Sequence, residues 1–72
     1  MKKRKNYLRM FLSYCTKNEI WFSVYGDGGI DECADTDDGW DFWPDNHLKL
    51  GSKAAYEWLV KTHREHVKEI RA

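Results

Sequence analysis

The sequence contains no run of about 20 apolar residues, the length that a membrane-spanning helix requires. It also contains no catalytic or cofactor-binding motif. The first residues are basic, but the apolar stretch behind them is short and is interrupted by Arg9, so we do not interpret it as a signal peptide. These absences favour a cytoplasmic protein that is not an enzyme and needs no cofactor.

Cysteine is scarce, since Cys15 and Cys33 are the only two in the chain. Zinc modules usually supply their cysteines as a close pair, whereas these two lie eighteen positions apart. A metal site formed by Cys15, Cys33, His63 and His66 is therefore a secondary hypothesis, and no metal site is expected. Without an export signal, reduced thiols packed as small apolar groups are favoured over a disulfide.

Lysine and arginine are absent from residues 18–48, although the whole chain has twelve basic and twelve acidic residues. Residues 18–48 carry nine acids, residues 1–17 carry six basic groups and no acid, and residues 49–72 carry six basic groups and three acids. Residues 1–5 are expected to form a flexible basic tail. Because zero net charge argues against a simple nucleic-acid binder, nucleic-acid binding through Lys2 to Lys5 is an alternative only.

Large side chains are plentiful, with four Trp, four Tyr and three Phe among 72 residues. A chain of this length makes one small domain, residues 1–72, that buries only about 60% of its surface. Each buried aromatic removes about 150–250 Å² from water, so a few of them can supply most of a thin core. The composition therefore predicts a folded chain.

Residues 19–25, EIWFSVY, predict a strand because they are rich in β-branched and aromatic residues. Trp21 and Tyr25 fall on one face of this strand, and Ile20 and Phe22 fall on the other. Both faces are apolar. We therefore expect one face to pack on a helix and the other to be covered or used.

Residues 53–71 predict a long C-terminal helix. Their apolar side chains fill one arc of the helix and their charged side chains fill the other. Ser52 is expected to be the N-cap, because its hydroxyl can accept a hydrogen bond from a free backbone N–H of the first turn.

Residues 6–16 are ambiguous, because their pattern fits both a strand and one helical face. Their aromatic content and the basic run before them favour a strand, since a helix N-terminus prefers acids. A turn at Lys17 and Asn18 would then form an N-terminal hairpin with residues 19–25, and residues 39–43 would add a brief third strand. We therefore predict an α+β fold: a two- or three-stranded antiparallel sheet, hairpin first, packed against one long C-terminal α-helix.

Acids and aromatics come together in residues 34–46, ADTDDGWDFWPDN. Clustered aspartates repel one another. Aromatic residues, however, dominate binding hot spots, and a field of one sign steers a partner of the other sign. The alternative is that the aromatics only complete the core and the aspartates pair with the basic termini. We predict a partner-binding surface formed by Asp35, Asp37, Asp38, Trp40, Asp41 and Trp43.

The partner expected for such a surface is a protein with a basic surface. Basic grooves commonly hold nucleic acid, so an acidic patch can compete for them by imitating phosphates. Small phage-encoded inhibitors of host nucleases and defence complexes share this size, acidity and lack of enzymatic motifs. We therefore expect an inhibitor that docks onto a basic groove of a nucleic-acid-handling protein. Membrane binding is not expected, and a homodimer is left open.

Overall fold

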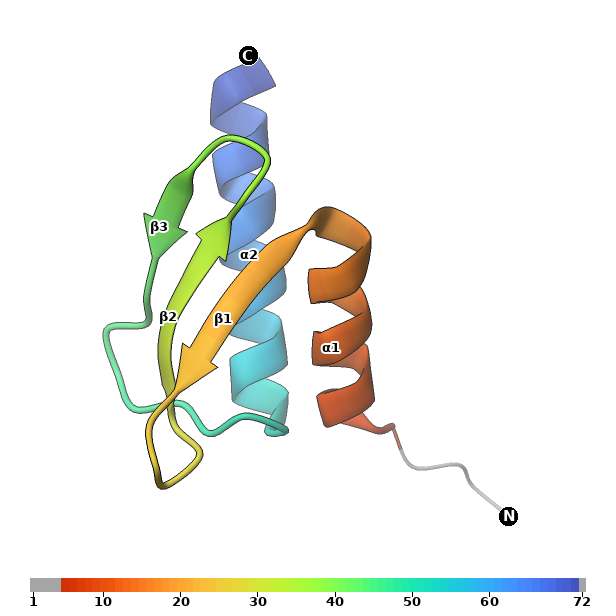
Figure 1. Cartoon of the computed structure of the whole chain (residues 1–72). Helices are drawn as coiled ribbons and strands as arrows, with labels where there is room; N and C mark the ends of the chain where they lie inside the picture. Colours follow the sequence, from red (N-terminus) through yellow and green to blue (C-terminus); the bar gives the residue numbers. More distant parts are fainter. Residues whose placement is uncertain (1–4, 72) are drawn as a thin grey trace.

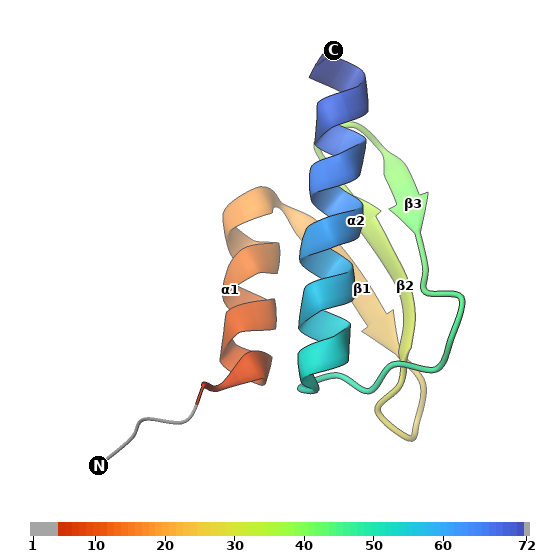
Figure 2. The same cartoon turned by 180° about the vertical axis from the view of Figure 1, so that it is seen from behind.

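The computed structural model describes residues 5–71, which form two helices and three strands (Figures 1 and 2). The order along the chain is α1 (Tyr7–Asn18), β1 (Ile20–Val24), β2 (Ile30–Asp35), β3 (Trp40–Phe42) and α2 (Lys53–Arg71). The α+β prediction, with a long C-terminal helix on an antiparallel sheet, is confirmed. No helix within residues 5–71 is long and apolar enough to cross a membrane. The basic tail predicted for residues 1–5 falls mostly on residues 1–4, outside the described residues.

The strand predicted for residues 6–16 is wrong, because this segment forms helix α1. The side chain of Asn6 accepts a hydrogen bond from the N–H of Arg9 at 3.1 Å and so caps the first turn, which the basic run before it does not prevent. Phe11 and Cys15, one turn apart, are the buried residues of α1. The helical periodicity of the segment therefore outweighs its aromatic content.

The hairpin predicted at Lys17 and Asn18 is also wrong, since both residues belong to the last turn of α1. Lys17 suits the negative end of the helix dipole. The chain reverses at Glu19, whose φ of 56° is left-handed and whose N–H donates to the carbonyl of Cys15. Because this cap leads directly into β1, α1 comes to lie against β1 and α2.

The sheet has the antiparallel order β1-β2-β3. β1 and β3 agree with the strands predicted at 19–25 and 39–43, although β3 is shorter than predicted. Gly28 has a φ of 88° in the β1–β2 turn, which a side chain would strain. Phe22 pairs with Cys33, and Cys33 pairs with Phe42, so these three side chains share one face.

Helix α2 lies across that face. The hydroxyl of Ser52 accepts a hydrogen bond from the N–H of Ala55 at 3.1 Å, which confirms the predicted N-cap. Leu59 is fully buried against the sheet and α1. The buried core consists of Phe11, Cys15, Ile20, Ile30, Cys33, Phe42, Ala55 and Leu59.

The opposite face of the sheet has no helix over it (Figure 1). Strand alternation places Trp21, Ala34 and Asp41 side by side there, since Trp21 pairs with Ala34 and Ala34 pairs with Asp41. Ser23 and Glu32 form the next pair on the same face. We call this surface the open face. Each acidic or aromatic side chain of the strands lies either on the open face or on the face that packs against α2.

Candidate functional site

The open face exposes large aromatic side chains. Trp21 and Tyr25 are each 54% exposed and Trp43 is 61% exposed. Indole and phenol rings exposed to this extent lose their contact with water when a partner covers them, and such rings dominate the free energy of many protein interfaces. The open face therefore offers anchors that the fold itself does not use.

Acidic side chains lie among these rings. Tyr25 and Trp43 line a shallow depression of about 470 Å³, together with Ile30, Asp31, Glu32, Pro44, Asp45, Asn46 and His47. The Asp31 carboxylate raises the pKa of Tyr25, by a hydrogen bond and by its negative charge. Within residues 5–71, no Lys or Arg lines the depression, so the described side chains give it a negative field.

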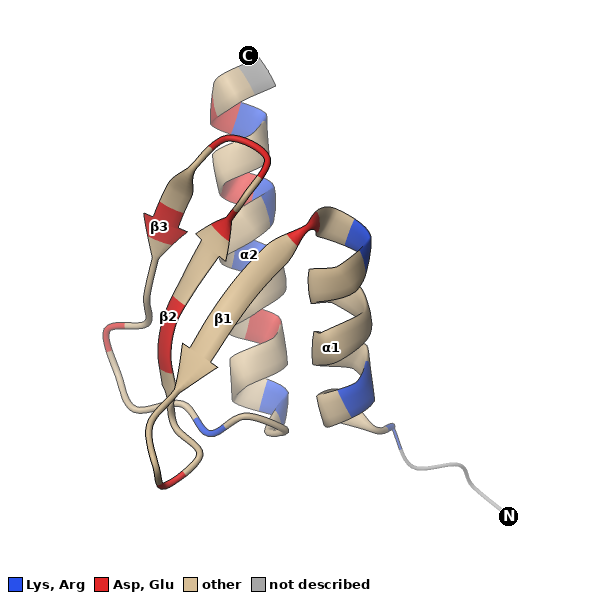
Figure 3. Cartoon of the chain, viewed as in Figure 1, with Lys and Arg blue, Asp and Glu red and all other residues tan. Residues whose placement is uncertain are grey.

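The charge of this surface is not balanced by neighbouring cations. β2 and β3 contain acids, β1 contains none, and no strand contains Lys or Arg, whereas both helices carry basic residues (Figure 3). Among the side chains that the structure describes, the ion pairs shorter than 4.0 Å all join an aspartate to a histidine. The predicted alternative, pairing of the aspartates with basic termini, thus finds no contact within the described part of the chain.

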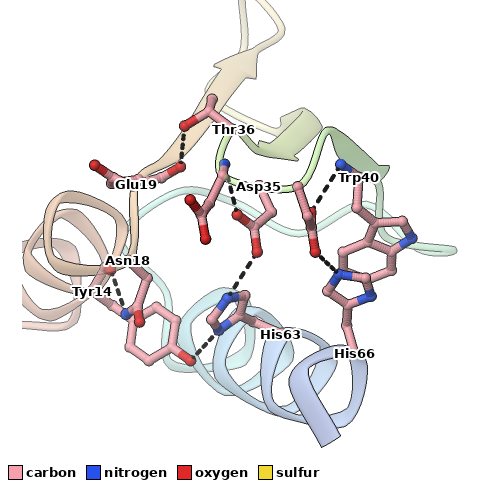
Figure 4. Close-up of polar contacts among 10 residues, drawn as sticks. Tyr14, Asn18, Glu19, Asp35, Thr36, Trp40, His63 and His66 are labelled. Atoms are coloured by element: carbon pink, nitrogen blue, oxygen red, sulfur yellow. Dashed lines mark hydrogen bonds and ion pairs between the residues drawn. The ribbon is translucent and has the colours of Figure 1, made fainter. Parts of the chain in front are cut away.

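A second polar region lies on the helix-facing side of the sheet, where the end of β2 meets α2 (Figure 4). Asp35 and His63 are both buried, with the Nε2 atom of His63 3.3 Å from the Oδ2 atom of Asp35. The Nδ1 atom of His63 lies 2.7 Å from the hydroxyl of Tyr14, so α1, β2 and α2 meet through this chain of contacts. Burial raises the pKa of Tyr14, which therefore stays protonated.

The β2–β3 loop continues this region, which we call the polar cluster: Asp35, Asp38, His63 and His66. The Nε2 atom of His66 lies 2.5 Å from the Oδ2 atom of Asp38. His66 beside it lowers the pKa of Asp38, mainly through their hydrogen bond. Trp40 stacks on the His66 ring, with centroids 3.8 Å apart and planes 8° apart. The loop and the start of β3 are thus fixed to α2 by both a hydrogen bond and a ring stack.

The six residues predicted as partner-binding separate between the two regions. Asp41 and Trp43 are exposed, and Asp41 lies on the open face. Asp35 is buried beside His63, and Asp38 and Trp40 contact His66, so these three serve the interior or the polar cluster. Asp37 is exposed in the β2–β3 loop. Asp35 has no surface with which to touch a partner.

The open face also includes residues outside the predicted set, namely Trp21, Tyr25, Asp31 and Glu32. Alternation along residues 19–25 already places Trp21 and Tyr25 on a second apolar face. Their neighbours in the sheet could not be read from the sequence, because the register with β2 depends on a bulge between Ser23 and Val24.

Cys15 and Cys33 do not join the histidines. Both thiols are free and buried in the apolar core. Burial raises the pKa of Cys15 to about 11 and that of Cys33 to about 12. No group of metal-ligating side chains within residues 5–71 combines these cysteines with the histidines. The structure therefore does not bring together the ligand set Cys15, Cys33, His63 and His66.

We expect both thiols to react slowly with a thiol reagent at neutral pH in the folded protein. Burial blocks access, and protonation removes the nucleophile. Absorbance with Ellman's reagent measures the rate, and the same protein in denaturant, where both cysteines should react at once, is the control. Rapid reaction of two thiols in the folded protein would contradict the placement of Cys15 and Cys33.

Comparison with known proteins assigns no family. No family model, no curated protein and no solved structure matches this chain. Function is therefore inferred from the chemistry of the open face and the polar cluster.

Proposed function

We propose that this chain is a non-enzymatic protein-binding module that docks its open face onto a basic surface of a partner protein. The observation that carries the proposal is the combination on the open face of three aromatic rings, each more than half exposed, with acids and, among the described side chains, no Lys or Arg. Monomeric proteins usually keep large aromatics covered, so rings exposed together on one face favour a binding surface.

The two kinds of side chain have different roles in such docking. Trp21, Tyr25 and Trp43 would fill apolar pockets of the partner and provide most of the affinity. Glu32 and Asp41 would approach its Lys and Arg side chains, which speeds association and excludes partners of the wrong charge. The affinity should therefore depend on the rings, and the association rate should depend on salt.

The partner class follows from the charge. A basic groove that accepts several carboxylates is a groove built for phosphates, so the partner is a nucleic-acid-handling protein and the chain acts as its inhibitor. Phage-encoded inhibitors of host defence complexes are of this physical type. Covering the groove with an acidic protein prevents nucleic acid from entering it.

The test uses two charge-reversed forms of the protein. Glu32→Lys with Asp41→Lys reverses the open face, and Glu57→Lys with Glu65→Lys makes the same change in net charge on the exposed side of α2. Immobilised wild type and the α2 variant should capture the same basic protein, and the open-face variant should lose it. Duplex DNA and higher salt should each release the captured protein, because the carboxylates occupy a phosphate site.

Trp43→Ala is the companion variant, since it removes an anchor without changing charge. Its affinity for the captured protein should fall by about 2 kcal/mol or more. Equal capture by the open-face variant and the wild type would refute the proposal. Retention of DNA by this chain alone would instead favour the alternative, a nucleic-acid binder that works through Lys2 to Lys5.

A further inference from the structure

The geometry points to a zinc site in the polar cluster, with Asp35, Asp38 and His66 as the protein ligands. One ligand atom from each of these three side chains lies within 4.8 Å of the other two. Zinc holds carboxylate oxygens and imidazole nitrogens at about 2.0–2.2 Å, so tetrahedral ligands lie about 3.4 Å apart. To hold zinc the three atoms would have to reach this spacing, which requires Asp38 and His66 to move apart from 2.5 Å.

The ligand atoms are held in place by contacts on their far sides. The Oδ1 atom of Asp35 accepts a hydrogen bond from the N–H of Asp37, and the Oδ1 atom of Asp38 accepts one from the N–H of Trp40, each at 3.1 Å. Each carboxylate thus has one oxygen tied to the loop backbone, which leaves Oδ2 for α2 (Figure 4). The ring of Trp40 fixes the plane of His66.

His63 and Tyr14 provide the outer support that metal ligands usually have. His63 Nε2 contacts the Oδ2 atom of Asp35 at 3.3 Å, and Tyr14 holds the other ring nitrogen of His63. Partners of this kind orient a ligating carboxylate and adjust its basicity. His63 is therefore a positioning residue of the site, and it reaches the metal through Asp35.

The charge of the cluster selects the ion. Two neighbouring carboxylates, one of them buried, repel each other, and a cation bound between them would offset this repulsion. A divalent ion balances two aspartates. Mg²⁺ and Ca²⁺ prefer all-oxygen sites, whereas an imidazole in the set favours zinc.

An entry path leads to the site. Asp35 and Asp38 line an open cleft of about 910 Å³ that also reaches His63, whereas His66 does not line it. The cleft runs between the end of α1 and the second half of α2, with Lys17, Arg64 and Lys68 on its sides. A hydrated ion can approach through this cleft, and water can fill the remaining coordination position.

The proposal is tested on full-length, tag-free protein that has been treated with EDTA and dialysed. Titration calorimetry with zinc chloride should give one site per chain, and zinc should raise the melting temperature. Asp38→Asn and His66→Gln each remove one ligand at a partly exposed position, so both variants should fold. Loss of a residue that only supports a ligand weakens metal binding by about 10–100-fold. Loss of a ligand itself should therefore weaken zinc binding by about 100-fold.

The matched control is His47→Gln. His47 pairs with Asp27 at 3.6 Å, but no third ligand joins them among the described residues. This variant should bind zinc like the wild type. The proposal is overturned if wild type binds no zinc, if the two ligand variants bind normally, or if magnesium or calcium binds more tightly than zinc. The site lies on the opposite side of the sheet from the open face, so failure here leaves the docking test unaffected.

Discussion

Replacing Phe11 with alanine should lower the free energy of unfolding by about 3–5 kcal/mol, the usual cost of removing a fully buried phenylalanine. Phe11 is 0% exposed and packs edge-on against Phe22, with ring centroids 5.2 Å apart. The replacement would leave a cavity between α1 and the sheet. A chain of this size has a small core, so few other side chains can compensate for the lost contacts. Urea denaturation, followed by circular dichroism, measures the loss.

Leu12→Ala is the matched control, because Leu12 is the next residue of α1 and is 40% exposed. It should cost less than about 1 kcal/mol. Comparable losses in the two variants would contradict the orientation of α1, since a helix that buries Phe11 and Cys15 turns Leu12 toward solvent.

Replacing Asp35 with alanine should also destabilise the fold, by about 1–3 kcal/mol, because it leaves the buried ring of His63 without an acceptor. His63 would keep its contact with Tyr14 but lose the carboxylate that lies 3.3 Å from Nε2. The free energy of unfolding is measured with EDTA present, so that metal does not contribute to it.

Asp37→Ala is the control for this prediction. Asp37 is exposed, and its contact with Asp35 is made by its backbone N–H, which alanine keeps. The change should be within about 0.5 kcal/mol. Double replacement of Asp35 and His63 should cost less than the sum of the single changes, because the pair is coupled. Additive losses would show that Asp35 and His63 do not stabilise each other.

The elements that the sequence predicts well have one unambiguous signal each. Residues 53–71 carry a long amphipathic pattern after Ser52, and residues 20–24 are dense in strand-forming side chains. The sequence of α1 predicts a strand wrongly because its apolar residues suit both periods, and the helix depends on a cap at Asn6 and a left-handed Glu19. Neither feature outweighs aromatic content when the sequence is read alone.

The residues predicted to bind a partner are divided between the open face and the polar cluster, and the sequence pattern does not show this division. The stretch 34–46 holds both charge and rings, but strand alternation sends neighbouring side chains to opposite faces. Trp40 turns inward to stack between His66 and Phe42, whereas Asp41 points out. The contacts of Asp38 with His66 span 28 positions, a separation that periodicity cannot predict. Acids and tryptophans that are adjacent in the sequence thus lie on opposite faces of the sheet.

The most direct measurement of the docking proposal uses the side-chain indole N–H signals of the four tryptophans in a two-dimensional NMR spectrum. Each is assigned by single replacement with phenylalanine. Trp21 and Trp43 are exposed, whereas Trp40 and Trp58 pack against the core. On addition of the captured basic protein, the signals of Trp21 and Trp43 should shift or broaden first, while those of Trp40 and Trp58 change least. Perturbation of Trp40 and Trp58 with no change at Trp21 and Trp43 would contradict docking through the open face.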